Sequence, residues 1–284
     1  MSLTHVAAIQ MAMSSSLKDN LKKAEKFVRA AAKAGANIVL LPELFMGPYF
    51  CQVEDYAHFE LATPLNQNAG IQHFQKIAQE LGVVLPISYF EKDNNVFYNS
   101  IAIINADGQI IGHYRKSHIP TGESYEEKFY FKPGDTGFKV FETKFGKLGV
   151  AICWDQWFPE AARIMALNGA ELLLYPTAIG SEPTLPLDSQ KHWTNAMVGH
   201  AASNLIPVIA ANRIGIEKAK QSSMTFYGSS FITNYNGEIL KQMDRITEGF
   251  VLQSFDLKAL EKLRYSWGVF RDRRPDLYGD LIKK

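Results

Sequence analysis

Short apolar runs alternate with amphipathic stretches along this chain. The runs are almost continuously apolar, which is typical of strands buried on both faces. Between the first two runs, apolar residues recur at helical spacing from Leu17, and Gly35 supplies a helix stop. A sheet with helices packed against it is therefore predicted. The predicted elements are strands over residues 5–10, 38–41 and 83–90 and helices over residues 17–31 and 71–81.

The chain also repeats itself. GANIVLLP, at residues 35–42, shares four of eight positions with GAELLLYP at 169–176. FYNSIAIINADGQIIG, at residues 97–112, shares seven of sixteen positions with FYGSSFITNYNGEILK at 226–241. The two offsets are 134 and 129 residues, so the order and spacing are nearly kept. Two similar half-units are the favoured interpretation, and a coincidence between generic segments is the alternative.

Each half-unit contains a tight-turn signal, Asp107-Gly108 in the first and Asn236-Gly237 in the second. Each half is therefore expected to be a helix-backed sheet that ends in a hairpin. Two such sheets stacked face to face form an α/β fold, a four-layer α-β-β-α sandwich with a pseudo-two-fold repeat. We expect one domain over residues 1–284, since no linker divides the halves. The aromatic and charged residues from about 260 to 284 are expected to form an arm at a subunit interface.

Composition narrows the class of protein. The 284 residues include 30 basic and 29 acidic side chains, and no basic stripe of the kind that binds nucleic acid is present. No apolar stretch approaches the length of a membrane span, so no membrane association is expected. Two cysteines are too few for a disulfide scaffold, and the N-terminal residues do not resemble a secretory signal. A reduced, cytoplasmic compartment is expected.

Cys153 is the candidate nucleophile. It follows the apolar run 148–152, and Pro159 starts a predicted helix shortly afterwards. A thiol at such a strand-to-helix elbow lies at the sheet edge, where main-chain N–H groups are expected to favour the thiolate. The alternative is that Cys153 packs as a small hydrophobic side chain. The other cysteine, Cys51, is expected to pack or to line the rim of a pocket.

Three charged residues are candidate partners of this thiol. Glu43 follows an apolar run, where a carboxylate is hard to explain by packing, and it is the candidate base. Lys116 ends a predicted strand and would stabilise an oxyanion. Glu127, beside an aromatic run, would hold Lys116, although Glu126 fits the pattern equally well. Ordinary exposed side chains are the alternative for Glu43 and Lys116, and none of the seven histidines has a compelling catalytic context.

The segments PELF, YRK with HIP, and GVAICWDQWFPEAAR together resemble the nitrilase, or carbon–nitrogen hydrolase, superfamily. The resemblance runs over nearly the whole chain. It places the family's Glu–Lys–Cys triad at Glu43, Lys116 and Cys153, and its second glutamate at Glu127. It implies an α-β-β-α sandwich and covalent hydrolysis of a carbon–nitrogen bond. It also implies a homo-oligomer, a dimer or a larger assembly.

Within the family, CWDQWFPE, EKFYFKPGDTGF and AIGSEP are similar to members that act on a cationic carbamoyl amine. The similarity implies hydrolysis of N-carbamoylputrescine to putrescine, carbon dioxide and ammonia, a step of polyamine biosynthesis. Members that bind a substrate carboxylate carry arginines after the nucleophile, but this chain has Gln156 and Trp157 there. Glu182 is the expected contact of the substrate ammonium, and Trp154 is expected to donate its main-chain N–H to the oxyanion. The expected substrate-binding residues are Trp154, Glu182, Tyr49, Gln156 and Trp157.

Two other functions stay open. One is a related activity of the same superfamily, a β-ureidopropionase or an aliphatic amidase. The other is a catalytically silent sandwich that serves as a scaffold. No metal and no other cofactor are expected, since the sequence has no CxxC, HExxH, GxGxxG or GxxxxGK[ST] pattern.

Overall fold

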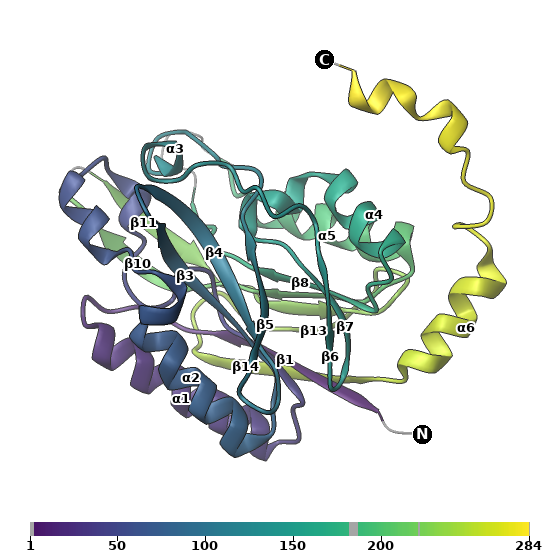
Figure 1. Ribbon diagram of the computed structural model, residues 1–284, viewed down its shortest axis with the longest axis horizontal. Coiled ribbons are helices and arrows are strands. Elements are labelled where there is room, and N and C mark those ends of the chain that lie inside the picture. The colour runs from purple at the N-terminus through teal and green to yellow at the C-terminus, as the bar shows by residue number, and fades with distance from the viewer. Residues whose placement is uncertain (1–2, 182–186, 221, 284) are drawn as a thin grey trace.

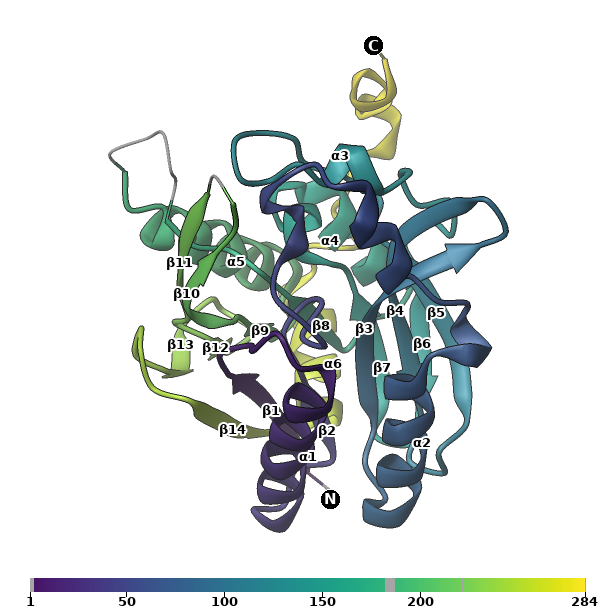
Figure 2. The same ribbon diagram turned by 90° about the vertical axis from the view of Figure 1, so that its left-hand side faces the viewer.

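Two β-sheets lie face to face in the computed structural model of this protein, and helices cover their outer faces (Figures 1 and 2). The structure describes residues 3–181, 187–220 and 222–283. The α-β-β-α sandwich predicted from the sequence is confirmed. Its two sheets also have the same internal order, which explains the repeat.

The first sheet has six strands in two hydrogen-bonded sections. β14, β1 and β2 form one section, and β3, β4 and β5 form the other. Two main-chain hydrogen bonds join them, from Val39 N to Val84 O and from Val84 N to Asn37 O, and β1 and β2 run parallel. In spatial order the strands are β14 (Gly249–Phe255), β1 (Thr4–Gln10), β2 (Ile38–Leu40), β3 (Leu85–Asp93), β4 (Val96–Ile104) and β5 (Ile110–Arg115).

The second sheet repeats this plan, with three parallel strands flanked by antiparallel ones. Both expected turns are present, and their glycines adopt the positive φ that such turns require, 81° at Gly108 and 87° at Gly237. A separate hairpin follows β9. The strands in order are β6 (Val140–Thr143), β7 (Gly146–Val150), β8 (Leu172–Pro176), β9 (Val208–Ala211), β12 (Phe231–Thr233) and β13 (Ile239–Gln242), and the hairpin is β10 (Ile214–Lys218) with β11 (Ser223–Tyr227).

Side chains that alternate along each strand build the layers. In β1, Ala7 and Ile9 pack with two helices, whereas Val6 and Ala8 belong to the core that includes the other sheet. The helices α1 (Leu17–Lys33) and α2 (Ala69–Leu81) cover the first sheet, and α4 (Pro159–Leu167) and α5 (Gln190–Asn204) cover the second. The remaining helices are α3 (Glu127–Tyr130), α6 (Leu257–Trp267) and the 3₁₀ helices η1 (Phe50–Gln52), η2 (Tyr56–Leu61), η3 (Leu65–Gln67), η4 (Cys153–Trp157), η5 (Pro275–Leu277) and η6 (Gly279–Ile282).

The predicted end of the strand before Cys153 is wrong. The strand expected over residues 148–152 ends at Val150, where its pairing with Leu174 of β8 ends. The 3₁₀ helix η4 then separates β7 from α4. The cause is local, because the Asp155 side chain accepts a hydrogen bond from the Ile152 N–H and turns the chain out of the sheet.

The C-terminal residues extend away from the sandwich (yellow in Figure 1). α6 contacts the body, and η5 and η6 follow it outward. The arm carries large apolar side chains that stay exposed, such as Trp267 at 70% and Ile282 at 89%. No helix in the described part of the chain has the length and apolar character needed to cross a bilayer.

Candidate active site

The candidate catalytic residues follow the carboxyl ends of strands. Glu43 lies three residues beyond β2, and Cys153 lies three residues beyond β7. Lys116 follows β5 directly, and Glu127 begins α3. Side chains at the carboxyl ends of parallel strands meet at one edge of a sheet, and here two stacked sheets contribute to the same place.

Lys116 connects two of the carboxylates. Its Nζ lies 2.9 Å from Glu43 Oε1, and 2.9 and 2.7 Å from the two carboxylate oxygens of Glu127. All three side chains are buried. The sequence left Glu126 and Glu127 as equal candidates for this contact, and the structure gives it to Glu127.

Glu43 keeps one oxygen unused. Its Oε1 accepts hydrogen bonds from Lys116 and from Asn99 Nδ2, the latter at 2.6 Å. Its Oε2 is buried and has no hydrogen-bond partner among the described residues. A carboxylate held on one oxygen and free on the other is suited to exchange protons with a neighbour. Sequence reasoning missed Asn99, although a polar residue within the apolar segment FYNSIAII was a usable signal.

Cys153 occupies a strained elbow. Its φ is 42°, in the left-handed region that residues other than glycine rarely adopt. The side chain is 5% exposed, and Sγ lies 3.9 Å from the main-chain oxygen of Ala178. Because Cys153 and Trp154 begin η4, their N–H groups belong to a first turn and have no acceptor within the helix. Such groups are suited to bind a developing oxyanion.

The Cys153 thiol is protonated at rest. Burial raises its pKa well above the ordinary range, the charge of Glu43 raises it further, and Lys116 lowers it only in part. Lys116 thus favours the thiolate, but burial outweighs its effect on the pKa. A base must remove the proton as attack begins.

Lys116 and Glu127 form a buried ion pair. Burial alone would lower the pKa of Lys116, but the charges of Glu127 and Glu43 outweigh it and raise that pKa well above its ordinary value. Burial raises the pKa of Glu127, and Lys116 offsets part of this rise. Lys116 therefore stays positively charged, and a fixed positive charge beside the thiol can stabilise an oxyanion.

Asp155 links the segment that carries Cys153 to the segment that carries Lys116. Its Oδ2 accepts hydrogen bonds from Ile152 N, at 3.0 Å, and Tyr114 Oη, at 2.7 Å. Its Oδ1 lies 2.9 Å from His118 N and 2.8 Å from His118 Nδ1. One buried carboxylate thus contacts the residue before Cys153 and residues on both sides of Lys116. Sequence reasoning missed Asp155, because these contacts link segments far apart in the chain.

The expected substrate contacts differ in their surroundings. Gln156 is buried, and its Oε1 accepts hydrogen bonds from Trp193 Nε1, at 2.7 Å, and Thr177 Oγ1. Only its Nε2 lacks a partner among the described residues. Trp154 is 38% exposed, and its ring meets the half-buried ring of Trp157 edge to face. Glu182 lies outside the described residues.

Tyr49 and Cys51 lie behind Glu127. Tyr49 is buried, and its Oη donates a 2.7 Å hydrogen bond to Glu127 Oε1. Cys51 is buried in an aromatic cluster, and its main-chain oxygen accepts a hydrogen bond from Glu126 N at 2.7 Å. Both residues therefore support the start of α3, where Glu127 lies.

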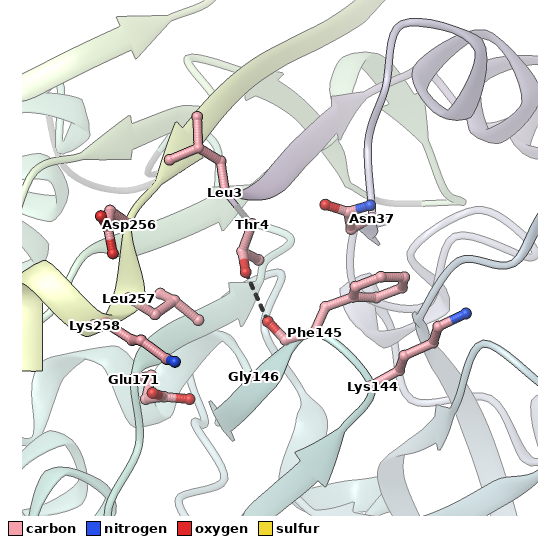
Figure 3. A pocket seen from close by; sticks show the side chains of 10 residues that line it. All are labelled: Leu3, Thr4, Asn37, Lys144, Phe145, Gly146, Glu171, Asp256, Leu257 and Lys258. Carbon is pink, nitrogen blue, oxygen red and sulfur yellow. Dashed lines mark hydrogen bonds between the residues drawn. The ribbon is translucent and has the colours of Figure 1, made fainter. Parts of the chain in front are cut away.

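A cavity of about 490 Å³ lies away from these residues (Figure 3). Its lining includes Thr4 and Gly146, the first residues of β1 and β7, and Asn37 and Glu171, which precede β2 and β8. It therefore opens at the amino ends of the strands, opposite to the catalytic candidates. Among residues 3–181, 187–220 and 222–283, no group of three or more His, Cys, Asp or Glu side chains has the arrangement of a metal site.

Fold and site together define a hydrolase with a cysteine nucleophile. The family model described as carbon–nitrogen hydrolase matches residues 5–265. The chain belongs to this family, which confirms the resemblance seen in the sequence.

Named relatives and a solved structure agree with this assignment. N-carbamoylputrescine amidase of Arabidopsis thaliana is 55% identical, over 98% of this chain and 94% of its own. Citrullinase of Francisella tularensis is 50% identical, over 98% of each chain. The crystal structure of a carbon–nitrogen hydrolase from Helicobacter pylori G27 matches with a TM-score of 0.94 and 39% identity, over 100% of this chain and 99% of that one.

Proposed function

We propose that this enzyme hydrolyses N-carbamoylputrescine to putrescine, carbon dioxide and ammonia. The observation that carries the proposal is the buried Lys116, whose Nζ is held by Glu43 and Glu127 beside a thiol that their charges influence. The 55% identity to a plant enzyme named for this substrate supports the choice among the family's activities.

The proposed reaction has two halves. In the first, Glu43 Oε2 takes the proton of Cys153, Sγ bonds to the carbamoyl carbon, and Lys116 with the Trp154 N–H binds the resulting oxyanion. One carbon–nitrogen bond then breaks, and Glu43 returns its proton to the departing nitrogen. In the second, Glu43 takes a proton from water, the hydroxide displaces Sγ, and the thiol regains its proton. Either nitrogen can depart first, and carbamate breakdown then gives the same products.

The side chains beside the nucleophile favour a substrate without a carboxylate at that position. Gln156 and Trp157 occupy the places where carboxylate-binding relatives carry arginine, and neither can form a bidentate ion pair. Glu182 is proposed from the sequence as the partner of the substrate ammonium. Replacing it by Gln is expected to raise KM for a cationic substrate and to leave a neutral amide unaffected.

Citrulline is the second candidate substrate. It carries the same ureido group, and a citrullinase is 50% identical to this chain over nearly its full length. Citrulline also carries a carboxylate, so its use would require a cationic partner that Gln156 and Trp157 do not provide.

Ammonia release from four substrates tests the proposal: N-carbamoylputrescine, citrulline, N-carbamoyl-β-alanine and a simple aliphatic amide. Turnover is expected with N-carbamoylputrescine, and Cys153→Ala should abolish it. Faster turnover of citrulline would show that citrulline is the substrate, and the proposed covalent mechanism would still stand. Near-normal turnover by Cys153→Ala would refute the covalent mechanism, and inactivity on all four would favour the silent scaffold.

We also propose that the C-terminal arm docks on a second copy of the chain. The arm projects from the sandwich, and its exposed apolar residues include Tyr265, Trp267, Leu277 and Leu281. Such side chains gathered on one projecting segment are typical of a surface that another protein covers.

A further inference from the structure

A buried guanidinium lies beside the site and donates hydrogen bonds to the main chain of the segment that carries Glu43. Arg213 is fully buried and follows β9 by two residues. Its Nη2 donates to the main-chain oxygens of Glu43, at 2.7 Å, and Leu44, at 3.1 Å. The charge of Arg213 is therefore directed at the backbone of the proposed base rather than at its carboxylate.

That backbone needs support. Leu44 has a φ of 48°, which is strained for a residue other than glycine. The oxygens of residues 43 and 44 both point to Arg213, and the Leu44 N–H donates to Ser88 Oγ at 3.0 Å. A buried carbonyl without a donor is unfavourable. Losing the guanidinium would therefore release the strained turn that carries Glu43.

Glu217 of β10 pairs with Arg213 and also contacts the other end of the segment 43–49. Its Oε1 accepts a 2.8 Å hydrogen bond from Arg213 Nη1, and its Oε2 accepts one from Tyr49 N at 2.5 Å. Tyr49 Oη in turn donates to Glu127, which holds Lys116, which contacts Glu43. The contacts form a closed ring, and the Arg213–Glu217 pair holds both ends of the segment 43–49.

We propose that the Arg213–Glu217 pair positions the Glu43 carboxylate for proton transfer. The proposal rests on the proposed role of Glu43 as the base. The pair does not touch the reacting atoms and acts through the turn after β2. A displacement of about 1 Å in such a group can reduce the rate by about 100-fold.

A double variant separates positioning from stability. Arg213→Met or Glu217→Met alone leaves an unpaired buried charge, so each should lower Tm and kcat. Arg213→Met with Glu217→Met removes both charges, and buried ion pairs replaced by apolar side chains often regain stability. We expect the double variant to regain part of the Tm lost in the single variants, since the main-chain groups of Glu43, Leu44 and Tyr49 still lack their partners. We expect kcat to stay about 100-fold low and KM to change less than about threefold. Recovery of kcat together with Tm would overturn the proposal.

Two further measurements keep the test decisive. Arg213→Lys retains the charge, but a lysine has one nitrogen and cannot take the places of both Nη1, which donates to Glu217, and Nη2, which donates to the carbonyls. We therefore expect kcat to fall with a small change in Tm. Unchanged kcat would count against positioning even if the double variant does not fold. A crystal structure of either folded variant should show a displaced Glu43 carboxylate. An unmoved carboxylate would refute positioning whatever the activity, whereas a wild type inactive on all four substrates would refute only the proposed function.

The matched control is an exposed ion pair. Arg29 and Glu80 pair through two hydrogen bonds on the helical surface of α1 and α2. Arg29→Met with Glu80→Met removes the same two charges and should leave kcat and KM at wild-type values. A comparable loss of kcat in this control would show that the Arg213 result is nonspecific.

Discussion

The Cys153 residue combines a strained backbone with an uncharged, buried thiol. A left-handed φ costs a residue other than glycine about 1 kcal/mol, so packing around the elbow must hold it in place. Glycine would remove the strain and also the nucleophile. The sequence indicates the elbow through its strand and helix signals but does not predict the sign of φ, because cysteine has no special preference for that region.

The raised thiol pKa values give a testable dependence of stability on pH. Burial raises the pKa of Cys51 and Cys153 well above the value of about 8.5 for an unfolded thiol. Below that pH both states keep the proton and nothing changes. Above it the unfolded state loses protons that the folded state keeps, so the free energy of unfolding falls as pH rises.

Cys51→Ala should reduce this pH dependence. Between pH 8 and 9.5, the free energy of unfolding of the variant should fall by about 1 kcal/mol less than that of the wild type, because one such thiol is removed. The variant should start from a lower stability at pH 7, because a buried side chain is shortened. Urea unfolding at both pH values measures the difference. Equal losses for wild type and Cys51→Ala would mean that the thiol ionises normally in the folded protein.

Strand ends were the part of the site that the sequence could predict. Glu43, Lys116 and Cys153 each follow an apolar run, and the structure brings Glu43 to Lys116 within hydrogen-bond distance. The same reasoning would have found Arg213, which follows the apolar run 208–211. This reasoning could not have found Asp155, because its carboxylate acts through contacts between η4 and the segment after β5, which are far apart in the sequence.

Asp155→Asn tests the link between these two elements. Whichever way the amide turns, its nitrogen cannot accept a hydrogen bond, so either Ile152 N and Tyr114 or His118 loses its acceptor. We expect the free energy of unfolding to fall by about 2–3 kcal/mol. We also expect kcat to fall more than KM changes, because Lys116 and Cys153 lose their fixed spacing.

Thermal unfolding and steady-state kinetics of the same preparation measure both effects. Asp272→Asn, at an exposed aspartate that pairs with Arg271, is the control and should change neither. Loss of stability with normal kcat would show that Asp155 only supports the fold.

At the scale of the whole molecule, the repeat predicted the architecture because it records the order of the strands. The segments 35–42 and 169–176 contain β2 and β8, which occupy matching places in their sheets. Glu43 and Thr177 follow at equivalent positions, and Glu43 N donates to Thr177 O at 3.3 Å. One half keeps a carboxylate at this position and the other a hydroxyl, so the matched ends meet but contribute different chemistry.

Deleting residues 269–284 tests the proposed role of the arm. The deletion removes η5 and η6 with their exposed apolar side chains and leaves α6 in place. Light scattering after size exclusion should show a smaller assembly than the full chain forms, with a Tm that depends less steeply on protein concentration. An unchanged mass would show that η5 and η6 do not hold the copies together and would leave only Tyr265 and Trp267 of α6 for that role.

The pairing of β1 with β14 has a consequence for how the chain folds during synthesis. Residues 4–10 pair with residues 249–255. The first strand to be synthesised therefore lacks its partner on this edge until the last strand has been synthesised. Until then β1 presents an open edge, which is a template for pairing with other chains. We expect nascent chains stopped before residue 249 to aggregate or to bind chaperones, and chains released with β14 to fold rapidly into the closed sandwich.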